Sequence, residues 1–391
     1  MSFFRIPTPV LSRSEIMSGL YVHIPFCASR CAYCGFFSTT AGGLKESYVN
    51  AVCTEAELLR DHTDAASVRT LYLGGGTPSQ LGNHLISKLI EGIGRHISLS
   101  GVTEATIECN PDDISRDFLD GLRTMPFNRI SLGVQSLDDS MLRFLNRRHS
   151  ADEAKAAIRL CIGYGFTNVS ADLIYGLPGQ TPESFRNDIV SLCRLGITHL
   201  SAYALSYEEG TPLSRMLAEG RITATDDDSY AEMYDILCRT AVSEGFQHYE
   251  ISNFCRPGFH SRHNSCYWDG THYIGLGAGA HSFDGQHRSW NVPDLKKYIG
   301  GIADGERRCG SETLSGTDLR NEMIMLSLRT SKGLSISEFS ARFGECEAQR
   351  LLQDAGKWIR NGKLILCDGA LRLSESAMFL GDGIVSSLFA D

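Results

Sequence analysis

The stretch HIPFCASRCAYCGFF, residues 23–37, places three cysteines within eight positions, namely Cys27, Cys31 and Cys34. It overlaps the end of LYVHI (20–24), a run of β-formers that predicts a short strand. Three thiols on the loop after a strand indicate a site for a soft metal, because thiolates bind such ions well. Most sites of this kind have four ligands, and no fourth cysteine lies close by.

Two kinds of metal site fit this loop. An iron–sulfur cluster is held by cysteine thiolates, and with three of them one iron stays open to a ligand that the chain does not supply. A zinc ion would instead take His23 as its fourth ligand. His23 lies inside the predicted strand, however, and structural zinc sites usually pair two cysteine knuckles. The sequence therefore favours the cluster over zinc.

The chain beyond the cysteines alternates short β-rich runs with longer amphipathic segments. The predicted strands are LYVHI (20–24), TLYLG (70–74), EATIEC (104–109), RISLGV (129–134), NVSADLI (168–174) and HLSAYAL (199–205). Helices are predicted between them, for example over 47–61 and 151–165. Six strand–helix units predict parallel pairing with right-handed crossovers but are too few for an eight-stranded barrel. We predict an α/β fold with a partial (β/α)6 barrel, a doubly wound sheet being the alternative.

Polar residues gather at the ends of these predicted strands. The cysteines follow the first strand and GGGTPS (74–79) follows the second, while Glu108, Gln135 and Asp172 lie at or near the ends of the next three. In both candidate folds the carboxyl ends of parallel strands form the active face. The sequence therefore predicts one shared site there.

The predicted domains are an N-terminal extension (1–19), the partial barrel (20–250), an irregular linker region rich in Gly, His and aromatic residues (251–310), and a C-terminal helical domain (311–391). Helical patterns in the last region precede KLILCDGALRLS (363–374), a predicted hairpin, and this order resembles a winged helix. Residues 311–391 contain nine Lys and Arg against eleven Asp and Glu. That charge disfavours DNA binding, so we expect a structural cap or lid.

The composition is that of a soluble globular protein, with a net charge of −9 that argues against broad nucleic-acid binding. Most of the 13 cysteines stand singly in apolar segments, which suggests a reducing, cytoplasmic compartment. The N-terminal stretch lacks the features of a signal peptide, and no run of 18 apolar residues occurs. Peripheral contact with a membrane and an oligomeric state both stay open.

The CxxxCxxC spacing after a first strand, in a chain of repeated strand–helix units, resembles the radical S-adenosylmethionine (SAM) superfamily. The resemblance implies a [4Fe–4S] cluster on Cys27, Cys31 and Cys34. It also implies that SAM chelates the fourth iron, and that the reduced cluster cleaves SAM to a 5′-deoxyadenosyl radical. The open iron position is then the centre of the chemistry.

Further motifs resemble oxygen-independent coproporphyrinogen III oxidase and its relatives. GGGTPS matches the superfamily's glycine motif, and TIECNPDD, SLGVQSLDD, FLNRRHS and ADLIYGLPGQTPES match the phrases around four strand ends. Carboxylates suit ribose hydroxyls and an ammonium group, and a guanidinium suits a carboxylate. The residues that the resemblance assigns to SAM are Tyr21, Tyr33, Gly75, Gly76, Thr77, Glu108, Gln135, Arg147 and Asp172.

RHNSCYWDGTHYIGLGAGAHSF (262–283) separates the members of this family. Alone, it suits an aromatic-rich loop packed on the mouth of the barrel. Its HNxxYW pattern, however, matches the haem-binding motif of the HemW haem chaperones, which YEISNF (249–254) and GLGAGAHS (275–282) also resemble. The residues that the resemblance assigns to haem are His263, Asn264, Tyr267 and Trp268.

Two departures distinguish the chain from the oxidase. Phe36 stands where the oxidase has a further cysteine, and the N-terminal extension is short. The resemblance therefore implies a haem chaperone that delivers haem to haem-dependent, membrane-bound respiratory clients, with SAM cleavage open and no coproporphyrinogen oxidase activity. An oxygen-independent coproporphyrinogen III oxidase, or another radical-SAM porphyrin enzyme, is the alternative.

Overall fold

The computed structural model describes residues 18–60 and 68–390. The predicted N-terminal extension lies outside the described residues for positions 1–17. Six parallel strands form the centre of the molecule, in sequence order: β1 (Ser18–Ile24), β2 (Val68–Gly75), β3 (Glu104–Cys109), β4 (Arg129–Gln135), β5 (Asn168–Tyr175) and β6 (His199–Ala204). Neighbouring strands pair in parallel throughout this series. The prediction of a partial (β/α)6 barrel is confirmed.

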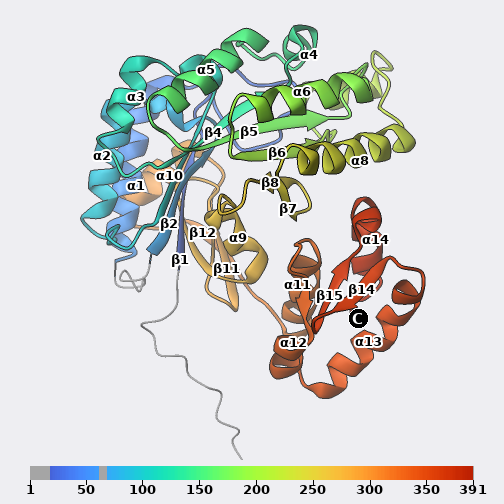
Figure 1. Ribbon diagram of the computed structural model, residues 1–391. Coiled ribbons are helices and arrows are strands. Elements are labelled where there is room, and N and C mark those ends of the chain that lie inside the picture. Colours follow the sequence, from blue (N-terminus) through green and yellow to red (C-terminus); the bar gives the residue numbers. More distant parts are fainter. Residues whose placement is uncertain (1–17, 61–67, 391) are drawn as a thin grey trace, which may run out of the picture.

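Helices cover the outer face of the strands (Figure 1). They are α1 (Lys45–Leu58), α2 (Gly82–Gly94), α3 (Arg116–Leu122), α5 (Ala151–Gly163), α6 (Pro182–Arg194) and α8 (Asp227–Ser243). Two short helices, α4 (Asp139–Phe144) and α7 (Pro212–Ala218), lie next to the cysteine loop, where Ala32 bonds to Leu145 and to Leu213. Polar N-caps set several of these starts; the hydroxyl of Ser150, for instance, accepts from the backbone N–H of Glu153 to form a capping box at α5.

Residue alternation along the strands separates an apolar core from a polar interior. In β4, Ile130, Leu132 and Val134 are buried in the core, whereas Arg129 and Ser131 line a cavity inside the barrel. Successive side chains of a strand point to opposite faces, so one face packs on the helices and the other lines the interior. The polar residues therefore lie inside the barrel because of their position in the pleat.

The central sheet continues beyond both edges. β8 (Asn253–Cys255) and β7 (Gln247–Glu250) extend it next to β6, and β9 (His272–Leu276), β10 (His281–Phe283), β11 (His287–Asn291) and β12 (Cys309–Thr313) extend it next to β1. The expectation of irregular structure over residues 251–310 is therefore wrong. β9 pairs with β1 in parallel, and α9 (Arg262–Asp269) and α10 (Leu295–Ala303) interrupt the strands.

A buried carboxylate attaches this extension to the barrel. Glu55 of α1 has no exposed surface and accepts from the backbone N–H of Gly277 at 2.8 Å and from the Tyr298 hydroxyl at 2.7 Å. It also accepts from Asn291 Nδ2 at 2.7 Å and from Arg307 Nε at 2.9 Å. The charge is thus paired and fully hydrogen-bonded, which is what burial of a carboxylate requires.

The C-terminal part is a separate unit of helices and a small sheet (Figure 1). It contains α11 (Gly316–Leu328), β13 (Leu334–Ser335), α12 (Ile336–Phe343), α13 (Glu345–Arg360), β14 (Leu364–Cys367), β15 (Ala370–Leu373) and α14 (Gly381–Ser386). The predicted order of helices followed by a hairpin is confirmed. The hairpin turns at Asp368 and Gly369, both with positive φ, as a two-residue loop requires. Among the described residues, no helix is long and apolar enough to cross a bilayer.

Candidate functional site

A cavity of about 660 Å³ opens inside the barrel and brings most of the predicted site residues together. Those that line it are Cys27, Cys31, Tyr33, Cys34, Gly75, Gly76, Thr77, Glu108, Gln135, Arg147, Asp172 and Asn264. Four strands, β2 to β5, and the segments that follow β1, β2 and β4 supply all of them but Asn264, which lies on α9, as expected for parallel strands whose carboxyl ends meet. Tyr21 does not line this cavity.

The cysteine loop is closed at its base by backbone hydrogen bonds. Cys27 N–H donates to Thr39 O at 2.9 Å, and Thr39 N–H donates to Pro25 O at 2.7 Å. The middle of the loop is docked on the barrel, because Ala32 N–H donates to Leu145 O at 3.0 Å. These contacts hold the three cysteines at the rim of the cavity.

Two polar groups point at cysteine sulfurs. The Thr77 hydroxyl lies 3.5 Å from Cys27 Sγ, and Arg147 Nη1 lies 3.2 Å from Cys31 Sγ. Burial raises the pKa of the Cys27 and Cys34 thiols, so their thiolates need nearby positive charge, which a cluster's iron supplies.

The donor set on the loop is the one that an iron–sulfur cluster takes. Cys27, Cys31 and Cys34 are free thiols that all line the cavity. Cysteine thiolates are the standard ligands of such clusters, so these residues fit a [4Fe–4S] cluster.

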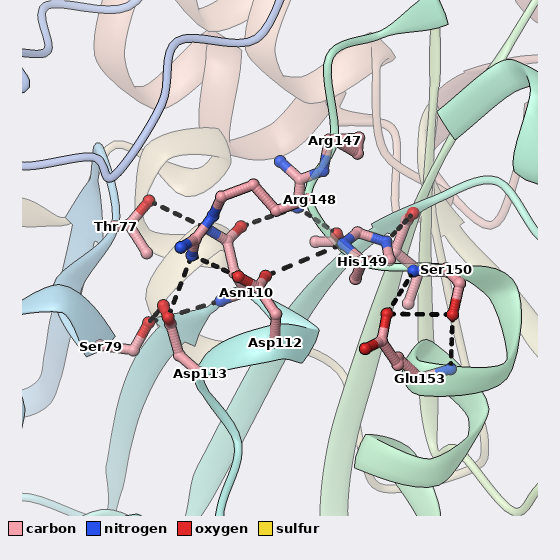
Figure 2. A network of polar contacts seen from close by, with 12 residues as sticks. Thr77, Ser79, Asn110, Asp112, Asp113, Arg147, Arg148, His149, Ser150 and Glu153 are labelled. Carbon is pink, nitrogen blue, oxygen red and sulfur yellow. Dashed lines mark hydrogen bonds and ion pairs between the residues drawn. The ribbon is translucent and has the colours of Figure 1, made fainter. Parts of the chain in front are cut away.

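Arg147 is held in a polar network at the cavity wall (Figure 2). Its Nη2 donates to Asn110 Oδ1 at 2.7 Å and to Gly133 O at 2.6 Å, and Asn110 Nδ2 in turn donates to the Thr77 hydroxyl at 3.4 Å. Arg147 Nε is buried without a partner in the described chain. A carboxylate in the cavity would satisfy this nitrogen, so Arg147 fits the binding of SAM's carboxylate.

The turn after β2 brings backbone close to the cysteine loop. Gly75 has φ +110°, and a Cβ there would lie 2.4 Å from the His23 ring. A Cβ on Gly76 would lie 2.8 Å from the Pro25 carbonyl carbon, while Gly76 N–H donates to Ile24 O at 2.8 Å. Only glycine satisfies both constraints, which explains the glycine run in physical terms.

Two carboxyl groups, one on β3 and one on β5, also line the cavity. Glu108 accepts from the Tyr72 hydroxyl at 2.6 Å and from Gly75 N–H at 3.1 Å, and burial raises its pKa to about 7. Asp172 accepts from the Ser131 hydroxyl at 3.3 Å, and burial raises its pKa as well. Both groups retain acceptor capacity toward the cavity, which suits hydroxyl or ammonium donors.

Gln135 ends β4 in an unusual backbone conformation, with φ +68° in a non-glycine residue. The register shifts between Gly133 and Gln135, so the strand bulges at the cavity. Such conformations gather at functional sites, where neighbouring packing holds them in place.

A second cavity of about 450 Å³ adjoins the first and is lined by Tyr21 and by the four residues predicted for haem, His263, Asn264, Tyr267 and Trp268. Tyr72, Glu108, Tyr203 and Asn264 line both cavities. The haem-motif residues all lie on α9, which Figure 1 shows between the barrel strands and α11. The motif is therefore helical rather than a loop.

His263 is the most enclosed residue of the motif, at 1 % exposure. Its Nδ1 pairs with the Thr70 hydroxyl at 2.8 Å and its Nε2 with the Tyr267 hydroxyl at 3.0 Å. Burial lowers the pKa of His263 to about 3, so the ring is neutral. Because both nitrogens are engaged, this imidazole holds Tyr267 and α9 in place; coordination of iron would break one of these bonds.

The cavities also contain residues that the sequence analysis did not single out. Arg129 is 1 % exposed and lines the first cavity, with Nε and Nη1 lacking a partner in the described chain. Glu250, Asn253 and Arg329 line the second. Arg129 stands inside a predicted strand and Glu250 inside YEISNF, so a charged residue in an apolar segment was the available signal.

Comparison with known proteins defines the class. Residues 21–192 match the radical SAM superfamily model, and residues 314–380 match the HemN C-terminal domain. The solved structure of coproporphyrinogen III oxidase (HemN) from Escherichia coli superposes with a TM-score of 0.83 at 24 % identity, over 97 % of this chain and 92 % of that one. Fold and domains are those of a HemN-like radical SAM protein.

Relatives found by sequence identify the family within this superfamily. "Heme chaperone HemW" of Mycobacterium tuberculosis is 36 % identical over 95 % of this chain and 94 % of its own length. The protein of that name from Lactococcus lactis is 31 % identical, over 95 % and 97 %. A mouse protein named "Radical S-adenosyl methionine domain-containing protein 1, mitochondrial" is 31 % identical, over 98 % and 89 %. The chain belongs to the HemW family.

Proposed function

We propose that this protein is a haem chaperone that holds a [4Fe–4S] cluster and SAM, binds haem beside them, and delivers it to haem-dependent proteins. The observation that carries the proposal is the position of α9. This helix carries the HNxxYW residues and borders a cavity that shares Glu108 and Asn264 with the cavity of the cysteine loop. Relatives named heme chaperone that align over most of the chain support the same function.

Cys27, Cys31 and Cys34 would hold the cluster. SAM would be bound by the glycine turn at 75–77, by Arg147 through its carboxylate, and by the acidic groups of Glu108 and Asp172. When bound, the two cofactors supply one-electron reductive cleavage of SAM. Arg147 also donates toward Cys31 Sγ, which stabilises negative charge on that sulfur.

Phe36 supports the chaperone over the oxidase. Its side chain is 70 % exposed at the position where the oxidase resemblance places a further cysteine. We further propose that the protein acts in the cytoplasm and that its clients include haem-dependent proteins of the respiratory membrane.

A transfer assay tests this function. The reconstituted protein is loaded with haem under anaerobic conditions and mixed with the haem-free form of a membrane-bound respiratory cytochrome. We expect the client's haem spectrum and activity to return, faster than with an equal amount of free haem. Loaded protein that fails to transfer haem would contradict the proposal.

A second incubation tests for the alternative function, coproporphyrinogen III oxidase activity. The same preparation receives coproporphyrinogen III, SAM and a reductant, and protoporphyrinogen is measured. We expect none above the level of the Cys27→Ser variant. Sustained turnover would instead identify a porphyrinogen decarboxylase.

A further inference from the structure

Four residues that line the second cavity each have a polar side-chain atom that is buried without a hydrogen-bond partner in the described chain. These atoms are Trp268 Nε1, Arg329 Nε, Glu250 Oε2 and Asn253 Oδ1. Buried donors and acceptors are nearly always paired, so four such atoms in one cavity indicate a polar ligand.

The two residues that carry the unpaired donors are neighbours. The Arg329 guanidinium carbon is 5.6 Å from the centre of the Trp268 ring. Arg329 Nη1 donates to Asp382 Oδ1 at 2.8 Å, while its carbonyl accepts from Ile251 N–H at 3.0 Å. Both ends of the arginine are thus fixed, while its Nε–H has no partner in the described chain.

Two residues with unpaired acceptors, Glu250 and Asn253, line the same cavity. Asn253 Nδ2 donates to Glu250 Oε1, so these two side chains already share one hydrogen bond. Burial raises the pKa of Glu250 to about 7, so a large fraction of this carboxyl is protonated at neutral pH. A protonated Glu250 is a further donor rather than a repelling charge.

We propose that Arg329 and the indole N–H of Trp268 bind a carboxylate of the ligand in the second cavity. This inference rests on the proposed function, in which the ligand is haem and the carboxylate is one of its propionates. A guanidinium and a nearby N–H can both donate to a carboxylate, and hydrogen bonds between charged groups are stronger than those between neutral groups. Arg329 lies directly after α11, so the C-terminal domain contributes to the haem site and its orientation.

The test compares haem with haem dimethyl ester, in which both propionates are neutral esters. Each is titrated into the reconstituted wild-type protein, Arg329→Gln and Trp268→Ala, and binding is followed at the Soret band. Arg372→Gln is the matched control, because it removes a guanidinium of the same domain that lines neither cavity. Thermal melting and iron content verify that each variant is folded and carries its cluster.

We expect wild type to bind haem about tenfold more tightly than the ester, as one charge-assisted contact predicts. Arg329→Gln should lose this preference by weakening haem alone, and Arg372→Gln should keep it. Equal weakening of haem and ester in Arg329→Gln, or a retained preference for haem, would overturn the carboxylate contact. Failure of the proposed function looks different: wild type would then show saturable binding of neither haem nor its ester.

Discussion

The pKa of Glu108 reflects the burial of its carboxyl inside the barrel. Its carboxyl lies near other interior groups, including Asp172 and the guanidinium of Arg129, whose Nε and Nη1 lack a partner in the described chain. Burial outweighs the hydrogen bonds from Tyr72 and Gly75 and raises the pKa of Glu108 from 4.5 to about 7. The proton is therefore held more tightly by the folded protein than by the unfolded chain.

This linkage predicts a pH dependence of stability. The stability that the folded protein gains by holding the Glu108 proton is present in full below pH 4.5 and is lost as the pH rises through about 7. In the cluster-free protein, the free energy of unfolding should therefore fall with rising pH more steeply in wild type than in Glu108→Gln. The difference between the two slopes should be about 1 kcal/mol per pH unit over this range. Urea unfolding at several pH values measures it. Glu232→Gln, an exposed change, should keep the wild-type slope; parallel curves for wild type and Glu108→Gln would contradict the prediction.

His263 is predicted to position the haem site rather than to coordinate iron. Replacement by Ala removes hydrogen bonds to Thr70 and Tyr267 and leaves a cavity, so we expect a loss of about 2 kcal/mol or more in stability. Haem affinity should fall while the position of the Soret band stays unchanged. His287→Ala, at an exposed ring, should alter neither property. A shifted Soret band in His263→Ala would identify His263 as an iron ligand.

Among the elements, the turn after β2 leaves no room for a side chain at Gly75 or Gly76. Gly75→Ala would force a side chain into a positive φ and against His23. We expect a loss of about 2 kcal/mol in stability and weaker SAM binding, measured by denaturant unfolding and equilibrium dialysis. Gly43→Ala meets open space and serves as the control. Unchanged SAM affinity in a folded Gly75→Ala protein would remove this turn from the SAM site.

The six parallel strands could be predicted because their apolar runs are bounded by polar residues at each strand end. β3 spans the predicted EATIEC, and the other five strands differ from their predictions by two residues or fewer at each end. The cysteine loop follows β1, as the sequence predicts, because the preceding strand fixes where Cys27 must lie.

α9 and the strands β9–β12 escaped prediction for a physical reason. α9 is only eight residues long, and it is held by contacts distant in sequence, such as the Glu104 carboxylate that accepts from the backbone N–H groups of Arg262 and His263. Short strands such as β10 contain few residues and acquire their stability by joining a sheet edge. Arg329 reaches the second cavity only through the packing of α11 on α9. These contacts join residues that are distant in sequence, so local sequence periodicity could not predict them.

For the whole molecule, Glu55 connects the barrel to the sheet extension that begins at β9. Glu55→Ala would leave the Tyr298 hydroxyl and the Gly277 N–H without their acceptor, and would remove the carboxylate that pairs with Arg307. We expect a loss of about 3 kcal/mol in the free energy of unfolding, because two buried donors lose their partner and a charge loses its counter-ion. Glu57→Ala, on the exposed side of the same helix, should change stability by less than about 0.5 kcal/mol. Equal effects of the two variants would contradict this role.

The arrangement of the two cavities gives the whole molecule its proposed function. The cysteine loop and the residues predicted for SAM other than Tyr21 line one cavity, α9 borders the other, and the C-terminal domain packs on α9 through α11 and Arg329. Haem would thereby be bound between the barrel and the C-terminal domain, with the cluster in the adjoining cavity.

The most direct test of this account is an anaerobic haem titration of the reconstituted protein, followed at the Soret band in wild type and Trp268→Ala. We predict saturable binding by wild type and binding about tenfold weaker by the variant, with about four irons per chain in both. Absence of saturable binding by wild type, or identical titration curves for the two proteins, would contradict the account.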